Sequence, residues 1–574
     1  MRILLLVHSF NSLSQRLFVE LQRDGHELSV ELDIHERITC EGVALFEPDL
    51  ILAPFLKRAI PAQLWQQHLC LIVHPGPPGD RGPSALDWAI LRGLPSWGVT
   101  VLQAEARLDA GAIWASALFP MRAARKSSLY RREVTEAAVI AVRAAIARVE
   151  VGSGPLAQAG DDAGHGWQPL LKRAQRAIDW NVDDTATILR KIHAADGYPG
   201  VVDTLLDRSF RLFDAHPEPR LSGQPGALIA RRHDAVCRAT RDGAVWIGQL
   251  QTVGESQPGF KRPAALVLGA VAESLPEVHE QGADVLRVAD EPEIRYEERG
   301  VVGYLHFDFY NGALATAYCE RLRRAFARAR ARPTRVIVLM GGSDFWCNGM
   351  HLHCIEAADS PAEASWANIN AMDDLAHDIL NTDTHLTIAA LQGNAAAGGV
   401  CLALAADRIV ADGGIVLNPH YRNMGNLYGS EYWTYLLPRR VGAEPAQRIM
   451  RERLPLGAPE ALALGMIDAL ADAGSGSLRA LAEAQAYDLS RNDQFAFALM
   501  EKRARRAADE QQRPLADYRS AELAQMRVSF YGADPSYHIA RHRFVYRTPH
   551  SWTPLHLAMH RRIGFRSGHT RVSA

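Results

Sequence analysis

The stretch LTIAALQGNAAAGGVCLALAA, Leu386 to Ala406, is about as long as a membrane-spanning helix and contains no charged residue. Two amide side chains, Gln392 and Asn394, and three glycines interrupt it. Because unpaired amides are costly to bury in an apolar environment, these residues argue against lipid. We expect a buried strand, a glycine turn and a buried helix instead. The stretch therefore predicts a globular α/β fold with no part in a membrane.

The whole chain has the size and composition of several globular domains. Its 574 residues are 48% hydrophobic, and at the usual length of about 100 to 200 residues per domain this predicts three or four domains. The formal net charge of −2 gives no reason to expect nucleic acid or an anionic membrane as a partner. Seven scattered cysteines without a CxxC pair favour reduced thiols in the cytoplasm over disulfides or a structural metal.

The order of apolar runs and turn residues predicts four regions. Residues 1–150 alternate apolar runs such as RILLLV with amphipathic helical stretches, the order expected of a parallel sheet wrapped by helices. A linker rich in Gly, Pro and Asp near residues 150–167 precedes a small β-rich domain over 168–270. We expect an α/β domain over 275–470 and a mostly charged, helical extension over 471–574.

One histidine stands where catalytic groups gather in such sheets. In IVHPGPPGDRG, Ile72 to Gly82, His74 directly follows the apolar run LCLIV. Ligands of open α/β sheets bind at the carboxyl ends of strands. An isolated histidine at this position could also be structural. The pattern of the surrounding residues is therefore needed to distinguish a catalytic His74 from a structural one.

The segment from His74 to Trp114 resembles the active-site region of the 10-formyltetrahydrofolate-dependent formyltransferases. The shared pattern is the histidine, a proline-rich loop that ends in Arg-Gly, then GVT, and then LDAG with Asp109. Further on, RAIDW and YPG are similar to the C-terminal OB-like domain of that family. The resemblance implies a formyltransferase-like first domain, an OB-like second domain and 10-formyltetrahydrofolate as the formyl donor.

The resemblance also implies a catalytic pair. In that family an Asn, a His and an Asp act together; His74 and Asp109 match the last two, whereas the Asn position is occupied by Ile72. Attack on an amide-like formyl group builds an oxyanion, which a cationic His74 held by Asp109 can stabilise. The side-chain amide that would assist it is absent.

Three later segments resemble successive elements of the crotonase superfamily of enoyl-CoA hydratases and isomerases. They are NGALATAYCERLRRAFARA, VIVLMGGSDFWCNGMHL and LQGNAAAGGVCLALAADRIVA. The resemblance implies an oxyanion hole for a coenzyme A thioester, formed by the backbone N–H groups of Met350 and Gly398. The two hydratase glutamates fall on Cys401 and His420, which argues against ordinary enoyl hydration.

The polar segment NPHYRNMGNLYGSEYWTYLLPRRVG offers other groups that could move a proton. Tyr421 and Glu431 are the best candidates by residue type. Alternatively, Tyr421 caps a turn and Glu431 pairs with Arg439 or Arg440. Cys401 lies in an apolar helical stretch that disfavours a thiolate, so we expect it to serve packing.

Coenzyme A would also need polar groups around its nucleotide and thioester. Asn311 and the basic residues Arg451 and Arg547 are candidates, chosen for their polar or charged side chains outside the apolar runs.

The two halves in one chain are similar along essentially its whole length to a family of NiFe-hydrogenase maturation proteins. That resemblance implies carbon monoxide synthesis for the hydrogenase metal centre, with formyl-CoA linking a formyl-transferring half to a thioester-binding half. The same features leave two alternatives open. The chain could formylate an amino substrate and carry a degenerate acyl-CoA module, or it could be a non-catalytic scaffold for hydrogenase or its maturation proteins.

Overall fold

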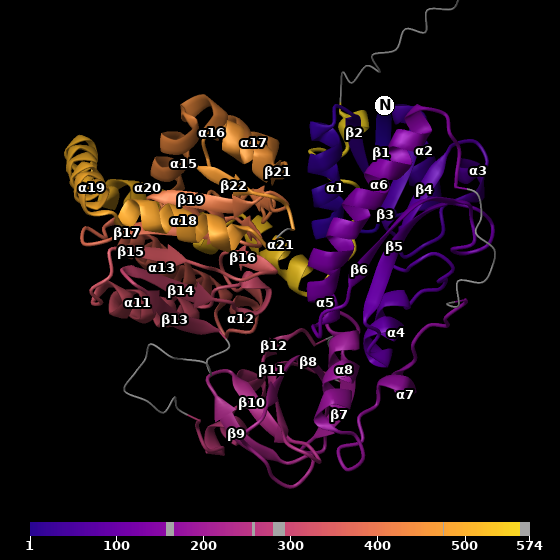
Figure 1. The fold of residues 1–574 in the computed structure, drawn as a ribbon, viewed down its shortest axis with the longest axis horizontal. Coiled ribbons are helices and arrows are strands. Elements are labelled where there is room, and N and C mark those ends of the chain that lie inside the picture. The colour runs from indigo at the N-terminus through magenta and orange to yellow at the C-terminus, as the bar shows by residue number, and fades with distance from the viewer. Residues whose placement is uncertain (157–165, 255–258, 279–292, 475, 563–574) are drawn as a thin grey trace, which may run out of the picture. The chain divides into compact units, whose positions relative to one another are not determined.

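The computed structural model describes residues 1–156, 166–254, 259–278, 293–474 and 476–562 (Figure 1). Its contacts divide the chain into two compact units. Unit 1 is Met1–His279 with Pro549–Ala574, and unit 2 is Glu280–Thr548. Most of the linker expected near residues 150–167 lies outside the described residues.

Unit 1 begins with a six-stranded sheet in the order β2-β1-β3-β4-β5-β6. Its first five strands are mostly buried, whereas β6 is partly exposed: β1 Arg2–Val7, β2 Glu27–Leu32, β3 Leu50–Phe55, β4 Cys70–His74, β5 Ser96–Gln103 and β6 Ile113–Pro120. The helix α1 Ser12–Arg23, capped by the side chain of Asn11, and α6 Thr135–Glu150 pack against each other, with α6 on β5 and β6. The expected α/β sheet wrapped by helices is confirmed.

The predicted parallel sheet contains one strand, β5, that runs against the others. Strands β1 to β4 pair in parallel, but β5 runs antiparallel to β4, and β6 antiparallel to β5. A parallel pair needs a crossover of about a dozen residues or more, usually a helix. The connection from β5 to β6 is shorter than that, so it can only return the chain antiparallel.

A second, antiparallel sheet of unit 1 has the order β7-β8-β11-β10-β9, with β12 Arg262–Pro263 paired to β11. Its strands are β7 Val201–Leu205, β8 Arg208–Glu218, β9 Leu228–Arg232, β10 Ala235–Ala239 and β11 Ala244–Thr252. Helix α8 Thr185–Ala195 packs on β8. This is the small β-rich domain that the turn residues predicted.

The end of the described chain returns to unit 1. Thr553 Oγ1 accepts the N–H of Leu32 at 2.9 Å and donates to Glu31 Oε1 at 2.7 Å. His560 Nε2 and Arg561 Nε each lie 2.8 Å from Glu31 Oε2. Residues 549–562, which the sequence analysis assigned to the C-terminal extension, therefore complete the surface of β2 through one buried carboxylate.

Unit 2 contains two sheets. The six strands of the larger one are ordered β13-β14-β15-β17-β19-β22: β13 Ile294–Arg299, β14 Val302–Phe307, β15 Val336–Leu339, β17 Leu386–Leu391, β19 Arg408–Asp412 and β22 Ala469–Ala471. The smaller one is ordered β16-β18-β20-β21: β16 Phe345–Cys347, β18 Asn394–Ala396, β20 Val416–Asn418 and β21 Leu456–Gly457.

Helices surround these sheets. Those that matter for the site are α11 Thr316–Arg330, α13 Pro361–Leu380, α14 Gly398–Leu404, α15 Trp433–Val441, α16 Ala443–Glu452, α18 Leu478–Ser490, α19 Asn492–Gln512, α20 Leu515–Tyr531 and α21 Ser536–Val545. Helix α13 packs on α11 and α20, and α18 on β15, β17 and β19. The predicted helical character of residues 471–548 is thus observed.

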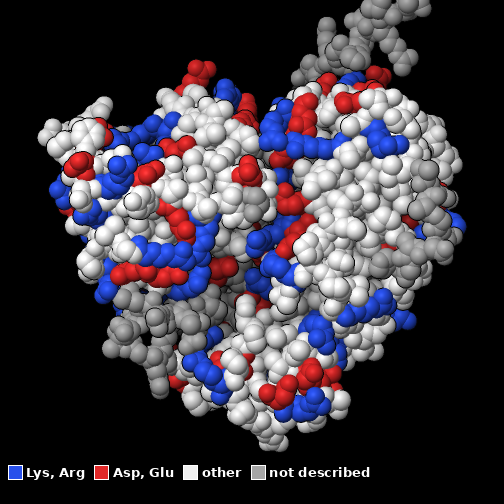
Figure 2. All heavy atoms as spheres, in the orientation of Figure 1, with Lys and Arg blue, Asp and Glu red and all other residues white. Residues whose placement is uncertain are grey.

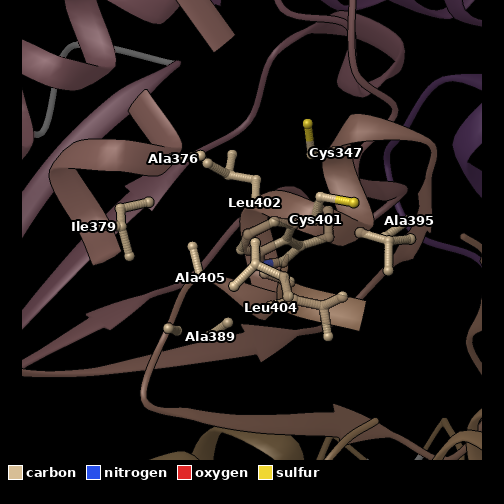
Figure 3. Close-up of a cluster of buried hydrophobic side chains, with 14 of the residues drawn as sticks. Cys347, Ala376, Ile379, Ala389, Ala395, Cys401, Leu402, Leu404 and Ala405 are labelled. Atoms are coloured by element: carbon tan, nitrogen blue, oxygen red, sulfur yellow. The ribbon is translucent and has the colours of Figure 1, made fainter. Parts of the chain in front are cut away.

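The stretch from Leu386 to Ala406 forms β17, β18 and α14, and its apolar side chains are buried. Figure 3 shows Cys401, Leu402 and Leu404 of α14 among the apolar side chains of this core. The predicted strand, glycine turn and helix are confirmed, with a short strand in the turn. None of the helices in the described ranges has the length and apolarity needed to cross a membrane.

Charged side chains of both signs are interspersed on the face shown in Figure 2. This agrees with the nearly balanced 63 Lys and Arg against 65 Asp and Glu.

Two candidate active sites

The first candidate site lies at the end of β4 in unit 1. His74 is the last residue of that strand and is 4% exposed. From the neighbouring β5, Trp97 Nε1 donates to the carbonyl of Pro75, and Thr100 Oγ1 donates to the carbonyl of Gly76, both at 2.8 Å. The strand therefore fixes the glycine- and proline-rich loop as well as the histidine.

Two carboxylates flank the His74 ring. Asp80 Oδ2 lies 2.9 Å from Nε2, and Asp109 Oδ2 lies 3.6 Å from Nδ1. Asp109 also accepts the N–H of Gly82 at 3.0 Å and adopts a positive φ of 52°. The structure thus brings together the predicted pair His74 and Asp109, with the loop between them.

Asp80 was missed by the sequence analysis, although it stands in the PGDRG run beside Arg81. It is 2% exposed, and its Oδ1 atom has no hydrogen-bond partner among the described residues. A Cβ atom at Gly76 would lie 2.4 Å from Asp80 Oδ2 and 2.5 Å from His74 Nε2. Only glycine lets the loop pass this close to the pair.

Ile72 supplies no polar group to this site. Its side chain packs against the apolar cluster that includes Leu4, Leu6 and Ile51. Ile72, which stands where the formyltransferase pattern has Asn, is therefore a core residue of β4.

The second candidate site lies in unit 2, where Met350 and Gly398 come together. Gly349, with φ of 78°, is so near α14 that a Cβ atom there would lie 3.3 Å from the nitrogen of Gly398. Met350 is held by Leu314, which donates to the carbonyl of Gly349 and accepts from the N–H of His351. Among the described residues, the structure records no acceptor for the N–H of Met350 or of Gly398. Both donors are thus available to a carbonyl oxygen.

The carboxyl group of Glu431 lies next to Gly398. A Cβ atom at Gly398 would lie 2.2 Å from Glu431 Oε1, so the carboxyl group sits directly against this glycine. Tyr421 donates its hydroxyl to Glu431 Oε2 at 2.8 Å, and both side chains are buried. The structure thus gathers Tyr421, Glu431 and Gly398 at one point.

The alternative pairings of Glu431 are wrong. Arg439 pairs with Asp509, and Arg440 lies 3.0 Å from Asp468. These arginines are therefore engaged elsewhere, and Glu431 is left in an apolar and acidic environment.

That environment determines the acidity of both groups. Burial, followed by the nearby Asp373 carboxyl, raises the pKa of Glu431 well above its ordinary value. Burial also raises the pKa of the Tyr421 phenol well above its ordinary value. A carboxylate with a raised pKa is a stronger base, whereas a phenol with a raised pKa keeps its proton.

Cys401 and His420, at the positions of the hydratase glutamates, are buried beside Tyr421. Burial raises the pKa of the Cys401 thiol well above its ordinary value. Its place in the apolar core (Figure 3) agrees with the predicted packing role, because a buried thiol is unreactive.

The candidate coenzyme residues lie on separate elements. Asn311 is in the short helical turn Tyr310–Gly312, and its carbonyl accepts from Asn348 Nδ2 at 2.8 Å, two residues before Met350. Arg451 is exposed in the last turn of α16, and Arg547 is exposed just after α21. The contact with Asn348 links Asn311 to the Met350 turn.

Two more carboxylates near Glu431 were missed. Asp373 of α13 and Glu522 of α20 are both fully buried. Asp373 stands on the apolar face of α13 with Ile369, Met372 and Ala376, and an acidic residue on a buried helix face is the signal that could have revealed it.

Comparisons with known proteins agree with both halves. The family model described as formyl transferase matches residues 31–146, that of the formyl transferase C-terminal domain matches 170–258, and that of enoyl-CoA hydratase/isomerase matches 302–553. Methionyl-tRNA formyltransferase of Granulibacter bethesdensis is 30% identical over 189 residues, 33% of this chain and 58% of that protein.

Two relatives match over nearly the whole chain. The hydrogenase maturation factor HoxX of Bradyrhizobium diazoefficiens is 54% identical over 570 residues, 98% of this chain and 97% of that protein. The crystal structure of HypX from Aquifex aeolicus in complex with tetrahydrofolic acid is 46% identical, with a TM-score of 0.93 over 99% of this chain and 100% of that one.

Proposed function

Because the chain belongs to the family of hydrogenase maturation factors called HoxX or HypX, we propose that it makes carbon monoxide for hydrogenase maturation in two steps. The first transfers a formyl group from 10-formyltetrahydrofolate to coenzyme A. The second splits formyl-CoA into carbon monoxide and coenzyme A. The relative bound to tetrahydrofolic acid supports a folate as the formyl donor.

In the first step the thiol sulfur attacks the formyl carbon. A C–S bond forms, the bond between the formyl carbon and folate N10 breaks, and the thiol proton ends on N10. The attack builds an oxyanion, which a protonated His74 can stabilise as a hydrogen-bond donor. Asp80 and Asp109, at 2.9 and 3.6 Å from the two ring nitrogens, orient the ring and compensate its charge.

In the second step a base removes the formyl proton. The electrons of the C–H bond remain on carbon, the C–S bond breaks with its electrons on sulfur, and the proton is returned to the thiolate. Carbon monoxide leaves with no net oxidation or reduction. The N–H groups of Met350 and Gly398 would polarise the formyl oxygen.

We assign the base to Glu431 and the supporting hydrogen bond to Tyr421. The phenol lies 2.8 Å from Glu431 Oε2, and its raised pKa leaves it as a donor at neutral pH. The observation that carries the assignment is the Glu431 carboxyl placed against Gly398, where a Cβ atom would meet Oε1 at 2.2 Å. A base in contact with an oxyanion hole can reach the hydrogen of a one-carbon acyl group.

The deciding experiment supplies the purified protein with 10-formyltetrahydrofolate labelled on the formyl carbon, with and without coenzyme A. We expect labelled carbon monoxide and free tetrahydrofolate only when coenzyme A is present. Formylation of an added amine without carbon monoxide would instead support the formyltransferase alternative. Release of neither product would support a scaffold.

The remaining expectations belong to the same proposal. Asn311, Arg451 and Arg547 would contact coenzyme A, hydrogenase maturation proteins would be the protein partners, and the protein would act in the cytoplasm.

A further inference from the structure

Glu431 stands on an unusual piece of backbone. Glu431 and Tyr432 have φ of 57° and 59° and immediately precede α15. Residues with a side chain rarely enter this left-handed region, and two in succession are unfavourable. Such a conformation persists only where neighbouring groups hold it.

Asp373 binds Ser430 and Glu431, at the start of this left-handed segment. From α13, its Oδ1 accepts the N–H of Glu431 at 2.7 Å, and its Oδ2 accepts the hydroxyl of Ser430 at 3.0 Å. Asp373 is 0% exposed, so these bonds are made without competition from water.

Glu522 binds Tyr432 and Thr434, which follow Glu431 in the chain. From α20, its Oε2 accepts the N–H of Tyr432 at 2.9 Å, and its Oε1 accepts the N–H of Thr434 at 2.9 Å. The Thr434 hydroxyl donates to Oε1 as well. Glu522 therefore binds the first turn of α15, where backbone N–H groups have no partner within the helix.

We propose that Asp373 and Glu522 are positioning residues for the second half-reaction, which fix Glu431 against Gly398 and increase its basicity through their negative charge. The inference rests on the proposed role of Glu431 as the base. It adds two residues that touch neither the formyl group nor the thioester.

A merely structural role would need only the hydrogen bonds of Asp373 and Glu522. The proposed role also needs their negative charge, which acts on Glu431. Among the described residues, the titratable groups that interact with Glu431 include one phenol, three thiols and two carboxyls: Tyr421, Cys319, Cys347, Cys401, Asp373 and Glu522. Arg519 is a cation beside Asp373: its Nε lies 3.6 Å from Asp373 Oδ2, and its Nη1 pairs with Asp374 at 2.7 Å.

At position 373 a neutral Asn could still accept the Glu431 N–H through its amide oxygen. At position 522 a Gln has one acceptor oxygen for the two backbone N–H groups that Glu522 binds, so it removes a hydrogen bond together with the charge. Burial raises the pKa of Asp373 to about 6 and that of Glu522 to about 7. Once ionised, these two carboxyls repel the charged form of Glu431, which is unfavourable for stability but makes Glu431 a stronger base. Burial, and after it Asp373 and then Glu522, raises the pKa of Glu431.

The test is Asp373→Asn in the full-length protein, assayed with 10-formyltetrahydrofolate and coenzyme A. Asn keeps the size and one acceptor for the Glu431 N–H but removes the charge. We expect the acid-side midpoint of the carbon monoxide rate to move down by about one pH unit, because the pKa of Glu431 falls. The plateau rate should fall about tenfold, because a weaker base abstracts the proton more slowly. Tetrahydrofolate release should stay at the parent rate.

Glu522→Gln is the second variant, and it carries the test alone if Asp373→Asn does not fold. The acid-side midpoint of its carbon monoxide rate should also move to lower pH, by less than in Asp373→Asn. The matched control is Asp407→Asn, which removes a carboxyl that is 14% exposed, accepts from Thr387 and pairs with Lys502. The control should keep the parent midpoint even if its melting temperature falls.

The outcomes separate the inference from the proposed function. A parent protein that makes no carbon monoxide overturns the proposed function and this inference with it. A parent that makes carbon monoxide while Asp373→Asn and Glu522→Gln keep its midpoint overturns the inference alone. A shifted midpoint in the Asp407→Asn control overturns it too, because the shift would then be a general effect of removing a carboxyl charge.

Discussion

At the scale of single residues, the first site depends on one imidazole between two carboxylates. His74→Ala and Asp109→Asn should each slow tetrahydrofolate release by about 100-fold, the effect of losing an acid-base or oxyanion group. Release is measured spectroscopically with saturating coenzyme A. Parent rates in both variants would exclude this site from the reaction.

Substitutions at the second site should affect carbon monoxide formation but not tetrahydrofolate release. Glu431→Gln and Tyr421→Phe should leave tetrahydrofolate release intact and stop carbon monoxide formation. Formyl-CoA, or formate from its hydrolysis, should accumulate and can be followed by mass spectrometry. If both variants still produce carbon monoxide at the parent rate, the base is another residue, and His420, next to Tyr421, would be tested next.

Gly398→Ala provides a sharper test of the same geometry. The backbone N–H would remain, but the new Cβ atom would occupy the position 2.2 Å from Glu431 Oε1, so the carboxyl group must move. We expect loss of carbon monoxide formation by about 100-fold or more, with tetrahydrofolate release unchanged. Ala397→Gly, one residue earlier, removes a methyl group instead and serves as the control.

These residues also mark how far the sequence could predict the site. His74, Asp109 and Gly398 were found because they lie in motifs with fixed spacing, and the structure brings each to the expected neighbourhood. Asp373 and Glu522 lie 58 and 91 positions from Glu431 in the chain, and only the packing of α13 and α20 brings them to it. The acidic residue on the apolar face of α13 indicates that Asp373 is buried, but no local pattern shows that its partner is Glu431.

At the scale of elements, hydrophobic runs predicted which segments are strands better than they predicted strand direction. The run GVTVLQ is correctly a strand of the first sheet, β5, yet its antiparallel pairing with β4 depends on how the chain returns. Side-chain patterns carry no information on that point. The four predicted domain ranges stay a proposal, whose test is limited proteolysis.

Elements outside the two sites should respond to coenzyme A. If Asn311, Arg451 and Arg547 contact it, coenzyme A at about 100 times its Kd should stabilise the protein by about 2.7 kcal/mol. Thermal unfolding monitors the shift, and each arginine-to-alanine variant should reduce it. No shift and no heat of binding at millimolar coenzyme A would count against the thioester scheme.

At the scale of the whole molecule, the buried Glu31 connects distant parts of the chain. Its burial opposes ionisation, but hydrogen bonds from His560, Arg561 and Thr553 hold its pKa below the ordinary value. A carboxyl with a depressed pKa stabilises the fold above its ordinary pKa, and this contribution is lost as the pH falls through the lower folded value.

Glu31→Gln should therefore destabilise unit 1 by about 3 kcal/mol at neutral pH, the cost of breaking a buried ion pair. The difference from the parent should shrink as the pH falls below the ordinary glutamate pKa of 4.5. Thermal unfolding across pH measures it, with Glu41→Gln as a control on the exposed partner of Arg561. A difference that does not change with pH would show that the hydrogen bonds, not the charge, matter.

The return of residues 549–562 to β2 has a consequence for how the protein is made. A ribosome builds the chain from Met1 onward, so β2 emerges more than 500 residues before the segment that covers Glu31. Until residues 549–562 have been made, the nascent first domain carries an uncovered β2, with the Glu31 carboxylate that is buried in the folded protein. Chains that stop before residue 549 would keep that defect, whereas chains that contain residues 549–562 can close it. Chains that lack residues 549–562 should therefore be cut by proteases in unit 1 more readily than chains that contain them.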